Sequence, residues 1–216
     1  MKKERISNSV VARLPQYYRC VEELYVTNCI RVSSATLSKR LGFTASQIRQ
    51  DFSCFGEFGL QGYGYNVKKL RYEIREILGL NSRNTAILVG CGDLGRALLK
   101  NFDFEACGFF LLAAFDLDAS LVGRQVGPIQ VLDAKRMERL VEAEKPSMAV
   151  LTVPTPSAQE VAELLGKLGV PAIWNFTGCR LAVDGVLVEQ VSFADSLLTL
   201  SYRLKQKRET EENPPE

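Results

Sequence analysis

Thr85-Ala-Ile-Leu-Val-Gly-Cys-Gly-Asp-Leu-Gly-Arg-Ala-Leu-Leu99 is the stretch of sequence that decides the fold. The apolar run 86–89 predicts a buried parallel strand, and the run 96–99 predicts the start of a helix. Between them, Gly90, Gly92 and Gly95 have the spacing G-x-G-x-x-G. In that geometry one glycine turns the chain tightly, one lets a pyrophosphate approach the backbone, and one lets helix and strand pack closely. The helix N-terminus then offers free N–H groups to the phosphates.

A carboxylate follows at a suitable distance. Asp116 closes the apolar run 109–115 and lies 21 residues after Gly95. A carboxylate there accepts hydrogen bonds from an adenosine ribose and repels a 2′-phosphate, which favours NAD(H) over NADP(H). The glycine spacing alone is a weak signal, because such turns also serve as structural bends. Strand, helix and acid together predict a Rossmann-type site formed by Gly90, Cys91, Gly92, Asp93, Leu94, Gly95, Arg96 and Asp116.

The alternation of strands and helices continues beyond this site. The apolar runs 148–153, 169–176 and 186–191 predict strands, and 134–143 and 157–168 have helical spacing. Ligands of parallel sheets lie beyond the carboxyl ends of the strands. We therefore expect Thr152, Val153, Pro154, Asn175 and Phe176 where a nicotinamide would lie, and we expect Trp174 to be core.

Two short helices dominate the first 80 residues. Ser33 or Ser34 caps a helix over 35–41 that Gly42 ends, and Thr44 caps a second helix over 45–54. Their arrangement is typical of a helix-turn-helix, although an αα-hairpin with a polar outer face has the same pattern. With Ile48 and Phe52 facing the core, the side chains left to contact base edges and phosphates are Ser46, Gln47, Arg49, Gln50 and Ser53.

The segments around these helices complete a winged helix. Residues 55–65 are rich in glycine and aromatics and predict a short β-hairpin. Asn66 caps a helix over 67–78, and the polar segment 80–84 marks a domain boundary. Residues 1–9 are predicted to be loose, with Pro15 in the first turn of a helix. In that helix an apolar face with helical spacing is predicted to be core: Tyr17, Tyr18, Val21, Leu24 and Tyr25.

Composition excludes several classes of protein. With 46% hydrophobic and 24% charged residues, the chain is typical of a soluble globular protein. No apolar run approaches the roughly 20 residues that span a bilayer, and the start lacks a signal peptide. The six cysteines form no C-x-x-C pair and are predicted to be small buried residues of a reducing cytoplasm. Histidine is absent, which disfavours metal sites and histidine-based catalysis.

Charge is distributed unevenly along the chain. Residues 1–80 contain 13 Lys and Arg against 7 Asp and Glu, whereas residues 81–216 contain 14 against 18. A basic first module joined to a slightly acidic nucleotide-binding module suggests that the first one meets a polyanion.

Three runs carry a resemblance to a known family: Arg49-Gln-Asp-Phe-Ser-Cys-Phe-Gly-Glu-Phe-Gly59, Gly62-Tyr-Gly-Tyr-Asn-Val67 and Gly90-Cys-Gly-Asp-Leu-Gly-Arg-Ala-Leu98. They resemble the Rex family of bacterial redox-sensing transcriptional repressors, which respond to the NADH/NAD⁺ ratio. The likeness covers about residues 10–204. It also includes Arg13-Leu-Pro-Gln-Tyr-Tyr18, Phe115-Asp-Leu-Asp118, Leu151-Thr-Val-Pro154 and Trp174-Asn-Phe176.

The resemblance implies an α/β homodimer that is not an enzyme. Its parts are a winged-helix DNA-binding domain (1–80), a Rossmann NAD(H)-binding domain (84–190) and a C-terminal helix exchanged between protomers (191–205). Such proteins bind a palindromic double-stranded operator when NADH is scarce and release it when NADH binds. The resemblance adds Arg13 and the wing residue Gln61 to the DNA-contacting set. The polar segment 206–216 is predicted to be a disordered tail.

This chain departs from the family pattern at three places. Many relatives have Lys at the position of Gln50 and a basic pair at Leu60-Gln61, so we expect weaker and less salt-sensitive DNA binding. Relatives often carry Asp at the position of Ser192, in a contact thought to relay the state of the cofactor.

Three other functions compete with this interpretation. An NAD(H)-dependent oxidoreductase with an accessory N-terminal domain would need a substrate domain, for which no residues remain. A CoA- or adenine-binding module would share the glycine turn. A DNA-binding protein with an empty Rossmann domain is disfavoured by the three glycines and Asp116.

Overall fold

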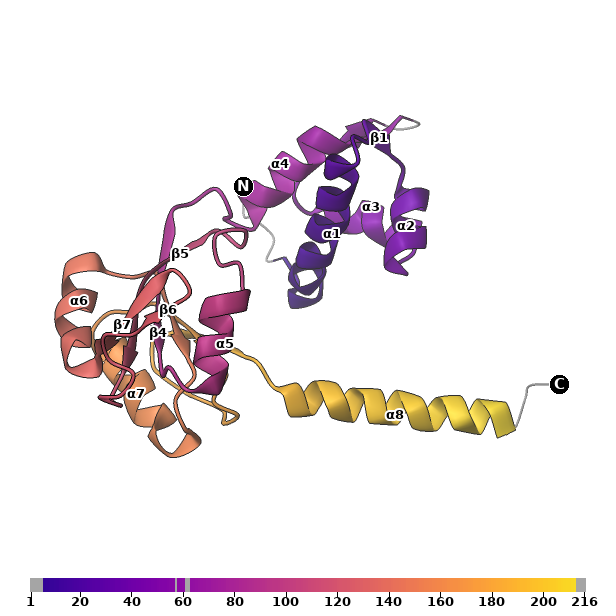
Figure 1. Cartoon of the computed structure of the whole chain (residues 1–216). Helices are drawn as coiled ribbons and strands as arrows, with labels where there is room; N and C mark the ends of the chain where they lie inside the picture. The colour runs from indigo at the N-terminus through magenta and orange to yellow at the C-terminus, as the bar shows by residue number, and fades with distance from the viewer. Residues whose placement is uncertain (1–5, 57, 61–62, 213–216) are drawn as a thin grey trace. The chain divides into compact units, whose positions relative to one another are not determined.

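The computed structural model describes residues 6–56, 58–60 and 63–212 of the 216-residue chain. It divides into two compact units, Met1–Arg83 and Asn84–Glu216, which are described separately (Figure 1). The division falls within the polar segment 80–84.

The first unit is a helix-turn-helix with a small antiparallel sheet. Its helices are α1 (Asn8–Val26), α2 (Ser34–Leu41), α3 (Ala45–Ser53) and α4 (Val67–Ile77), and its strands β1 (Arg31–Val32), β2 (Gly59–Leu60) and β3 (Gly64–Asn66) have the order β1-β3-β2. The side chains of Ser33, Thr44 and Asn66 accept backbone N–H groups at the starts of α2, α3 and α4, as the sequence predicts. Gly42, with a φ of 75°, ends α2.

Helix α1 begins earlier than predicted. Ser7 is its N-cap and Asn8 its first residue, so Pro15 lies in the interior of the helix and its placement in the first turn was wrong. An interior proline forgoes one backbone hydrogen bond. Helix α1 continues across Pro15 because Val10, Leu14 and Tyr17, on both sides of it, are all buried. Tyr25, predicted to be core, is 39% exposed.

The second unit contains a seven-stranded sheet with the order β10-β9-β8-β4-β5-β7-β6. All neighbouring strands are parallel except β6 and β7. The chain runs outward from β4 through β5 to β7 and then returns to β8, so the strand order reverses between β4 and β8. This switch point is where dinucleotide-binding folds hold their ligand. The strands are β4 (Asn84–Val89), β5 (Phe109–Asp116), β6 (Gln125–Val126), β7 (Ile129–Asp133), β8 (Met148–Leu151), β9 (Ala172–Asn175) and β10 (Leu187–Gln190).

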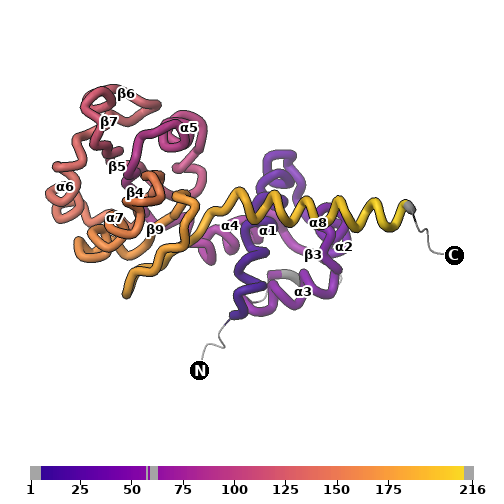
Figure 2. Tube along the Cα trace, turned by 90° about the horizontal axis from the view of Figure 1, so that it is seen from below, coloured from indigo at the N-terminus to yellow at the C-terminus, as the bar shows by residue number. Residues whose placement is uncertain are grey.

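Helices cover both faces of this sheet. Helix α5 (Asp93–Asn101) lies on one face, and α6 (Met137–Glu144, after the short 3₁₀ helix Ala134–Arg136) and α7 (Thr155–Lys167) lie on the other (Figure 1, and from below in Figure 2). Alternate residues of β4 divide between them. Leu88 belongs to the same buried cluster as Leu99 of α5, whereas Ile87 clusters with Val141 of α6 and Ala162 of α7.

The C-terminal helix α8 (Phe193–Glu212) is longer than predicted. The prediction of a disordered segment over 206–216 was wrong for residues 206–212, which are helical; residues 213–216 lie outside the described part. Two ion pairs four residues apart support this extension, Lys205–Glu209 at 3.6 Å and Lys207–Glu211 at 3.7 Å.

The cysteines are less uniformly buried than predicted. All six are free, and Cys20 and Cys91 are buried, but Cys54 and Cys107 are exposed. Cys54 is the C-cap of α3, and Cys107 lies in the turn before β5. Within the described ranges, no helix is long and apolar enough to cross a membrane.

Candidate functional site

The glycine turn connects β4 to α5 and packs against the segment that follows β8. Gly90 has a φ of 98°, and its N–H donates to the carbonyl oxygen of Phe115 at 2.8 Å. A Cβ atom built on Gly90 would lie 2.8 Å from the backbone nitrogen of Val153. The hydroxyl of Thr152 donates to the carbonyl oxygen of Gly90 at 2.6 Å. The structure therefore brings Thr152 and Val153 against the glycine turn, with the exposed Pro154 next to them.

Gly95 and Gly92 differ in what surrounds them. A Cβ atom on Gly95 would lie 2.0 Å from the carbonyl oxygen of Gly90, so α5 packs against the turn at a distance only glycine allows. A Cβ atom on Gly92 would meet no atom of the described residues within 4 Å. Gly92 is exposed and starts α5, and no side chain in the described part caps that helix. The turn thus leaves open space at the N-terminus of α5, and this fits the diphosphate of a dinucleotide.

Asp116 ties β5 to the turn. Its carboxylate accepts the N–H groups of Cys91 and, at 2.8 Å, of Asp118. A carboxylate has lone pairs beyond these two bonds, so Asp116 can also accept from ribose hydroxyls. Arg96 braces the other side of the turn by donating to the carbonyl oxygen of Cys91 at 2.9 Å and pairing with the exposed Asp93 at 2.6 Å.

A cavity of about 510 Å³ lies between α5 and the loop that follows β5, with Asp118 in its wall. Arg96, Lys100 and Arg124 contribute cations to its wall, and Asp118 contributes one carboxylate. The backbone N–H of Ser120, which also lines the cavity, donates to Asp118 at 2.8 Å. The wall therefore has an excess of positive charge.

Cys91, inside the turn, is fully buried. Burial, together with the nearby charge of Asp116, raises the pKa of its thiol to about 12. The thiol is therefore protonated at neutral pH, and Cys91 serves the turn as a small packed side chain.

The two residues predicted at the end of β9 occupy different environments. Asn175 is fully buried. Its amide nitrogen donates to the carbonyl oxygen of Cys179 at 2.8 Å, and its amide oxygen accepts the N–H and hydroxyl of Thr177 at 3.0 and 2.7 Å. Asn175 thus holds the loop after β9 in shape, whereas the half-buried Phe176 keeps part of its ring exposed.

An aromatic cluster that the sequence did not predict extends from Phe176. Trp174, expected to be core, is only half-buried, and its ring lies 4.6 Å from Phe176 and 5.3 Å from Phe102 between centroids. Phe176 is 6.4 Å from Phe193, the first residue of α8. The cluster connects the end of β9 to the start of α8, and no short-range sequence pattern joins residues so far apart.

The predicted DNA-contacting side chains of α3 lie mostly on its surface. Ser46, Arg49, Gln50 and Ser53 are exposed and Gln47 is half-buried. Arg49 also donates to the hydroxyl of Ser34 at 3.0 Å, and this bond joins α3 to the start of α2. Ile48 and Phe52 are buried, as predicted. Gln61 lies outside the described residues.

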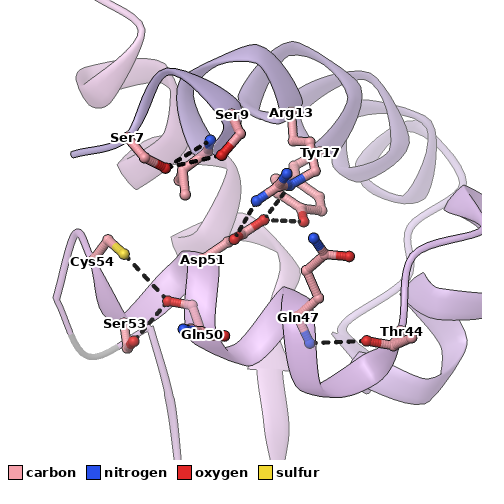
Figure 3. A network of polar contacts seen from close by, with 11 residues as sticks. Ser7, Ser9, Arg13, Tyr17, Thr44, Gln47, Gln50, Asp51, Ser53 and Cys54 are labelled. Carbon is pink, nitrogen blue, oxygen red and sulfur yellow. Dashed lines mark hydrogen bonds and ion pairs between the residues drawn. The ribbon is translucent and has the colours of Figure 1, made fainter.

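Arg13 is placed differently from the residues of α3. Its Nε and Nη2 atoms donate to the two carboxylate oxygens of Asp51, each at 2.7 Å (Figure 3). Asp51 is 2% exposed and also accepts the hydroxyl of Tyr17 at 2.6 Å. Sequence reasoning missed this network. The available signal was that Asp51 shares a helix face with the apolar Ile48 and Phe52, where a carboxylate requires a partner.

Comparison with known proteins follows the same two-part division. Residues 5–53 match the family model described as "Putative DNA-binding protein N-terminus", and residues 81–179 match "CoA binding domain". The "Redox-sensing transcriptional repressor Rex" of Clostridium tetani is 44% identical over 209 residues, covering 96% of this chain and 99% of the relative. The chain belongs to the Rex family.

Solved Rex structures have the same fold. RSP, a Rex-family repressor, in complex with beta-NAD+ and operator DNA matches with a TM-score of 0.89 and 40% identity, covering 97% of both chains. RSP in complex with beta-NADH matches with a TM-score of 0.88 and 38% identity, covering 97% of this chain and 99% of that one. As a member of the Rex family, the chain is a transcriptional repressor and not an enzyme.

The structure gives Ser192 a local partner. Its hydroxyl oxygen accepts the backbone N–H of Asp195 at 3.1 Å, so Ser192 caps the first turn of α8.

Proposed function

We propose that this protein represses transcription by binding a palindromic operator as a homodimer, and that it releases the operator when NADH binds. The observation that carries the proposal is that one chain has both an open glycine turn at the switch point of its parallel sheet and a helix α3 whose polar side chains are exposed. A single polypeptide thus combines a dinucleotide site with a helix-turn-helix. The relatives in complex with operator DNA, NAD⁺ and NADH support both halves.

In the proposed complex the dinucleotide lies across the switch point. The turn from Gly90 to Gly95 and the N-terminus of α5 hold the diphosphate, and Asp116 holds the adenosine ribose. The loop of Thr152, Val153 and Pro154, together with Phe176, lines the nicotinamide end. Asn175 supports that end from behind.

The proposed homodimer is supported by apolar surface. Along one face of α8, Phe193 is 64% exposed, Leu197 67% and Leu200 52%. On the sheet face that carries α5, Phe102 is 37% exposed, and Trp174 and Phe176 are only half-buried. A monomer would leave both surfaces in water, whereas a second copy can cover them by inserting its α8.

NADH must act by shifting a population of dimers. The dimer has one geometry that fits the operator and one that does not. Release requires that NADH bind the second geometry more tightly than the first. Phe176 and Phe193 connect the end of β9 to α8, which makes α8 the element through which this preference would reach the partner. We place the protein in the cytoplasm, where its operator and its dinucleotides meet.

CoA is the competing ligand, because the matched domain model carries that name. CoA bears a phosphate on its adenosine ribose. The carboxylate of Asp116 accepts the N–H groups of Cys91 and Asp118, and next to the ribose in the proposed complex it would repel that phosphate. The carboxylate therefore favours NADH.

Selection of DNA by the full-length protein tests the proposal. The protein is incubated with a randomised duplex pool without dinucleotide, the retained duplexes are sequenced, and they are then challenged with NADH, NAD⁺ or CoA. We expect palindromic duplexes that NADH elutes and that NAD⁺ and CoA do not. Retention that is equal with NADH and NAD⁺, or elution by CoA alone, would contradict the proposal.

A further inference from the structure

We infer that Arg13 and Asp51 are positioning residues for DNA recognition: their buried ion pair fixes the orientation of α3 on α1. Arg13 therefore does not serve the complex as a phosphate contact. This inference rests on the proposed function, since it presumes that α3 reads DNA.

The geometry of the pair is the first argument. Two parallel bonds of 2.7 Å join the guanidinium of Arg13 to the carboxylate of Asp51. A planar bidentate pair restricts both distance and rotation, which a single contact does not. The hydroxyl of Tyr17, one turn further along α1, adds a third bond to the same carboxylate at 2.6 Å. Two consecutive turns of α1 therefore hold one side chain of α3 (Figure 3).

The position of Asp51 within α3 is the second argument. Gln50, one residue before it, and Ser53, two residues after it, are exposed on the predicted DNA-contacting surface, while Asp51 itself is buried. A rotation of α3 about its axis would move these side chains and break the pair at the same time. Phe52, next to Asp51, packs edge-on against Tyr17 at 5.0 Å between ring centroids, so polar and apolar contacts fix the same rotation.

Burial and charge exclude a simple phosphate contact by Arg13. Its side chain is only 17% exposed, and the nearby carboxylate neutralises its charge. Asp51 also stays ionised: burial raises its pKa, but the hydrogen bonds from Arg13 and Tyr17 outweigh burial and hold the pKa below its usual value. A buried ion pair is weak evidence for stability, and in some proteins such polar groups specify one arrangement, which is the role inferred for this pair.

A second bidentate pair in the same unit provides a matched control. Arg71 of α4 donates to both carboxylate oxygens of Glu22 of α1, at 2.7 and 2.9 Å. This pair joins α1 to α4 and does not involve α3. Glu22→Gln therefore removes a bidentate ion pair of the same geometry, with a more exposed carboxylate, without releasing the orientation of α3.

The experiment measures the affinity of full-length variants for a duplex selected by the wild-type protein and for a scrambled duplex, as a function of salt. For Asp51→Asn we expect at least a tenfold loss of discrimination between the two duplexes with an unchanged salt slope, because no phosphate contact is removed. For Glu22→Gln we expect discrimination within about twofold of wild type. Arg49→Gln, at an exposed cation, should instead reduce the salt slope by about 1.

If Arg13 instead contacts phosphate, Asp51→Asn frees its charge, so affinity for both duplexes should stay the same or rise together, with discrimination between them unchanged; that result would overturn the inference. Failure of the wild-type protein to select any duplex would overturn the proposed function instead.

A second variant tests the inference if Asp51→Asn fails to fold, because it removes the Arg13–Asp51 ion pair and is expected to keep the fold. Arg13→Met combined with Asp51→Leu replaces the ion pair with apolar side chains, a change that is often neutral or stabilising. We expect this double variant to retain its far-UV circular dichroism and to lose operator discrimination. Discrimination equal to wild type in the folded double variant would refute the positioning role.

Discussion

The Cα atom of Gly95 faces the carbonyl oxygen of Gly90, and a Cβ atom on Gly95 would lie 2.0 Å from that oxygen. Strand β4 and helix α5 therefore meet at a distance that no other residue type allows. Gly92, three residues earlier, has no described atom within 4 Å of its missing Cβ. One glycine serves the packing of the fold, and the other serves the ligand.

These two glycines predict different phenotypes. Gly92→Ala should leave the free energy of unfolding within about 0.5 kcal/mol of wild type and weaken NADH binding about 100-fold, or ~2.7 kcal/mol, because the methyl group occupies the space of the diphosphate. Gly95→Ala should destabilise the second unit by about 2–3 kcal/mol through overpacking. Denaturation followed by the emission of Trp174, the single tryptophan, and calorimetric titration with NADH measure both quantities. Equal destabilisation by the two substitutions would contradict this division of roles.

Asp116 should determine which dinucleotide binds. In Asp116→Asn the charge that opposes a 2′-phosphate is removed, while Arg96 and Arg124 remain in the wall of the cavity between α5 and the loop that follows β5. We expect NADH affinity to fall about tenfold, through loss of a charged hydrogen bond of roughly 1.5 kcal/mol, and NADPH affinity to rise. Competition titrations of the two cofactors check this. Asp103→Asn, at an exposed carboxylate that accepts the N–H of Ala106 in the following loop, is the control, and an equal change there would argue against Asp116.

Acid should destabilise the first unit through two carboxylates. Burial raises the pKa of Asp51, but hydrogen bonds from Arg13 and Tyr17 bring it below the usual 3.8. Arg71 lowers the pKa of Glu22 below the usual 4.5. A lowered folded-state pKa means that the stabilisation is fully present above these usual values and is lost as the pH falls below them through the folded-state pKa.

The corresponding measurement is far-UV circular dichroism during urea unfolding between pH 7 and pH 2. Asp51→Asn should lower the stability of the first unit at pH 7 by about 3–5 kcal/mol, because Arg13 is left buried without a partner. It should also reduce the slope of stability against pH below pH 4. A slope identical to that of wild type would show that Asp51 contributes nothing to the acid sensitivity.

Charge on the apolar face of α8 should separate the proposed dimer. Leu197→Glu with Leu200→Glu introduces two carboxylates where we propose that the partner packs, and each leucine forfeits about 1.5–3 kcal/mol of burial. Sedimentation at micromolar concentration should show monomers, with operator binding lost. Gln206→Glu, on the opposite face of α8, adds charge away from Leu197 and Leu200 and should remain dimeric. A dimeric double variant would exclude α8 as the interface.

Sequence patterns predicted local structure well. Cap residues such as Ser33 and Thr44 identified the starts of α2 and α3, because a cap depends only on the next three residues. The glycine spacing located the turn for the same reason. Helix α1 was misplaced because the burial of Val10, Leu14 and Tyr17 outweighs the usual effect of Pro15. The end of α8 was misplaced because the charged residues 205–211 were interpreted as a disordered tail, whereas they form ion pairs four residues apart that support a helix.

The contacts between distant segments were not predictable in this way. Arg13 and Asp51 are 38 residues apart, and Phe176 meets Trp174 and Phe102 only after the sheet has formed. Asn175 was expected at the ligand, but its burial follows from the loop to Cys179, whose shape no periodicity specifies.

The central claim is that NADH, held at the turn from Gly90 to Gly95, controls operator binding. The most direct measurement is the fluorescence anisotropy of a labelled selected duplex while the NADH share of a constant NADH plus NAD⁺ pool is raised. We predict that bound duplex falls steadily as NADH replaces NAD⁺, and that Gly92→Ala abolishes the response while still binding the duplex. A wild-type curve that stays flat across the whole range of ratios would contradict the account.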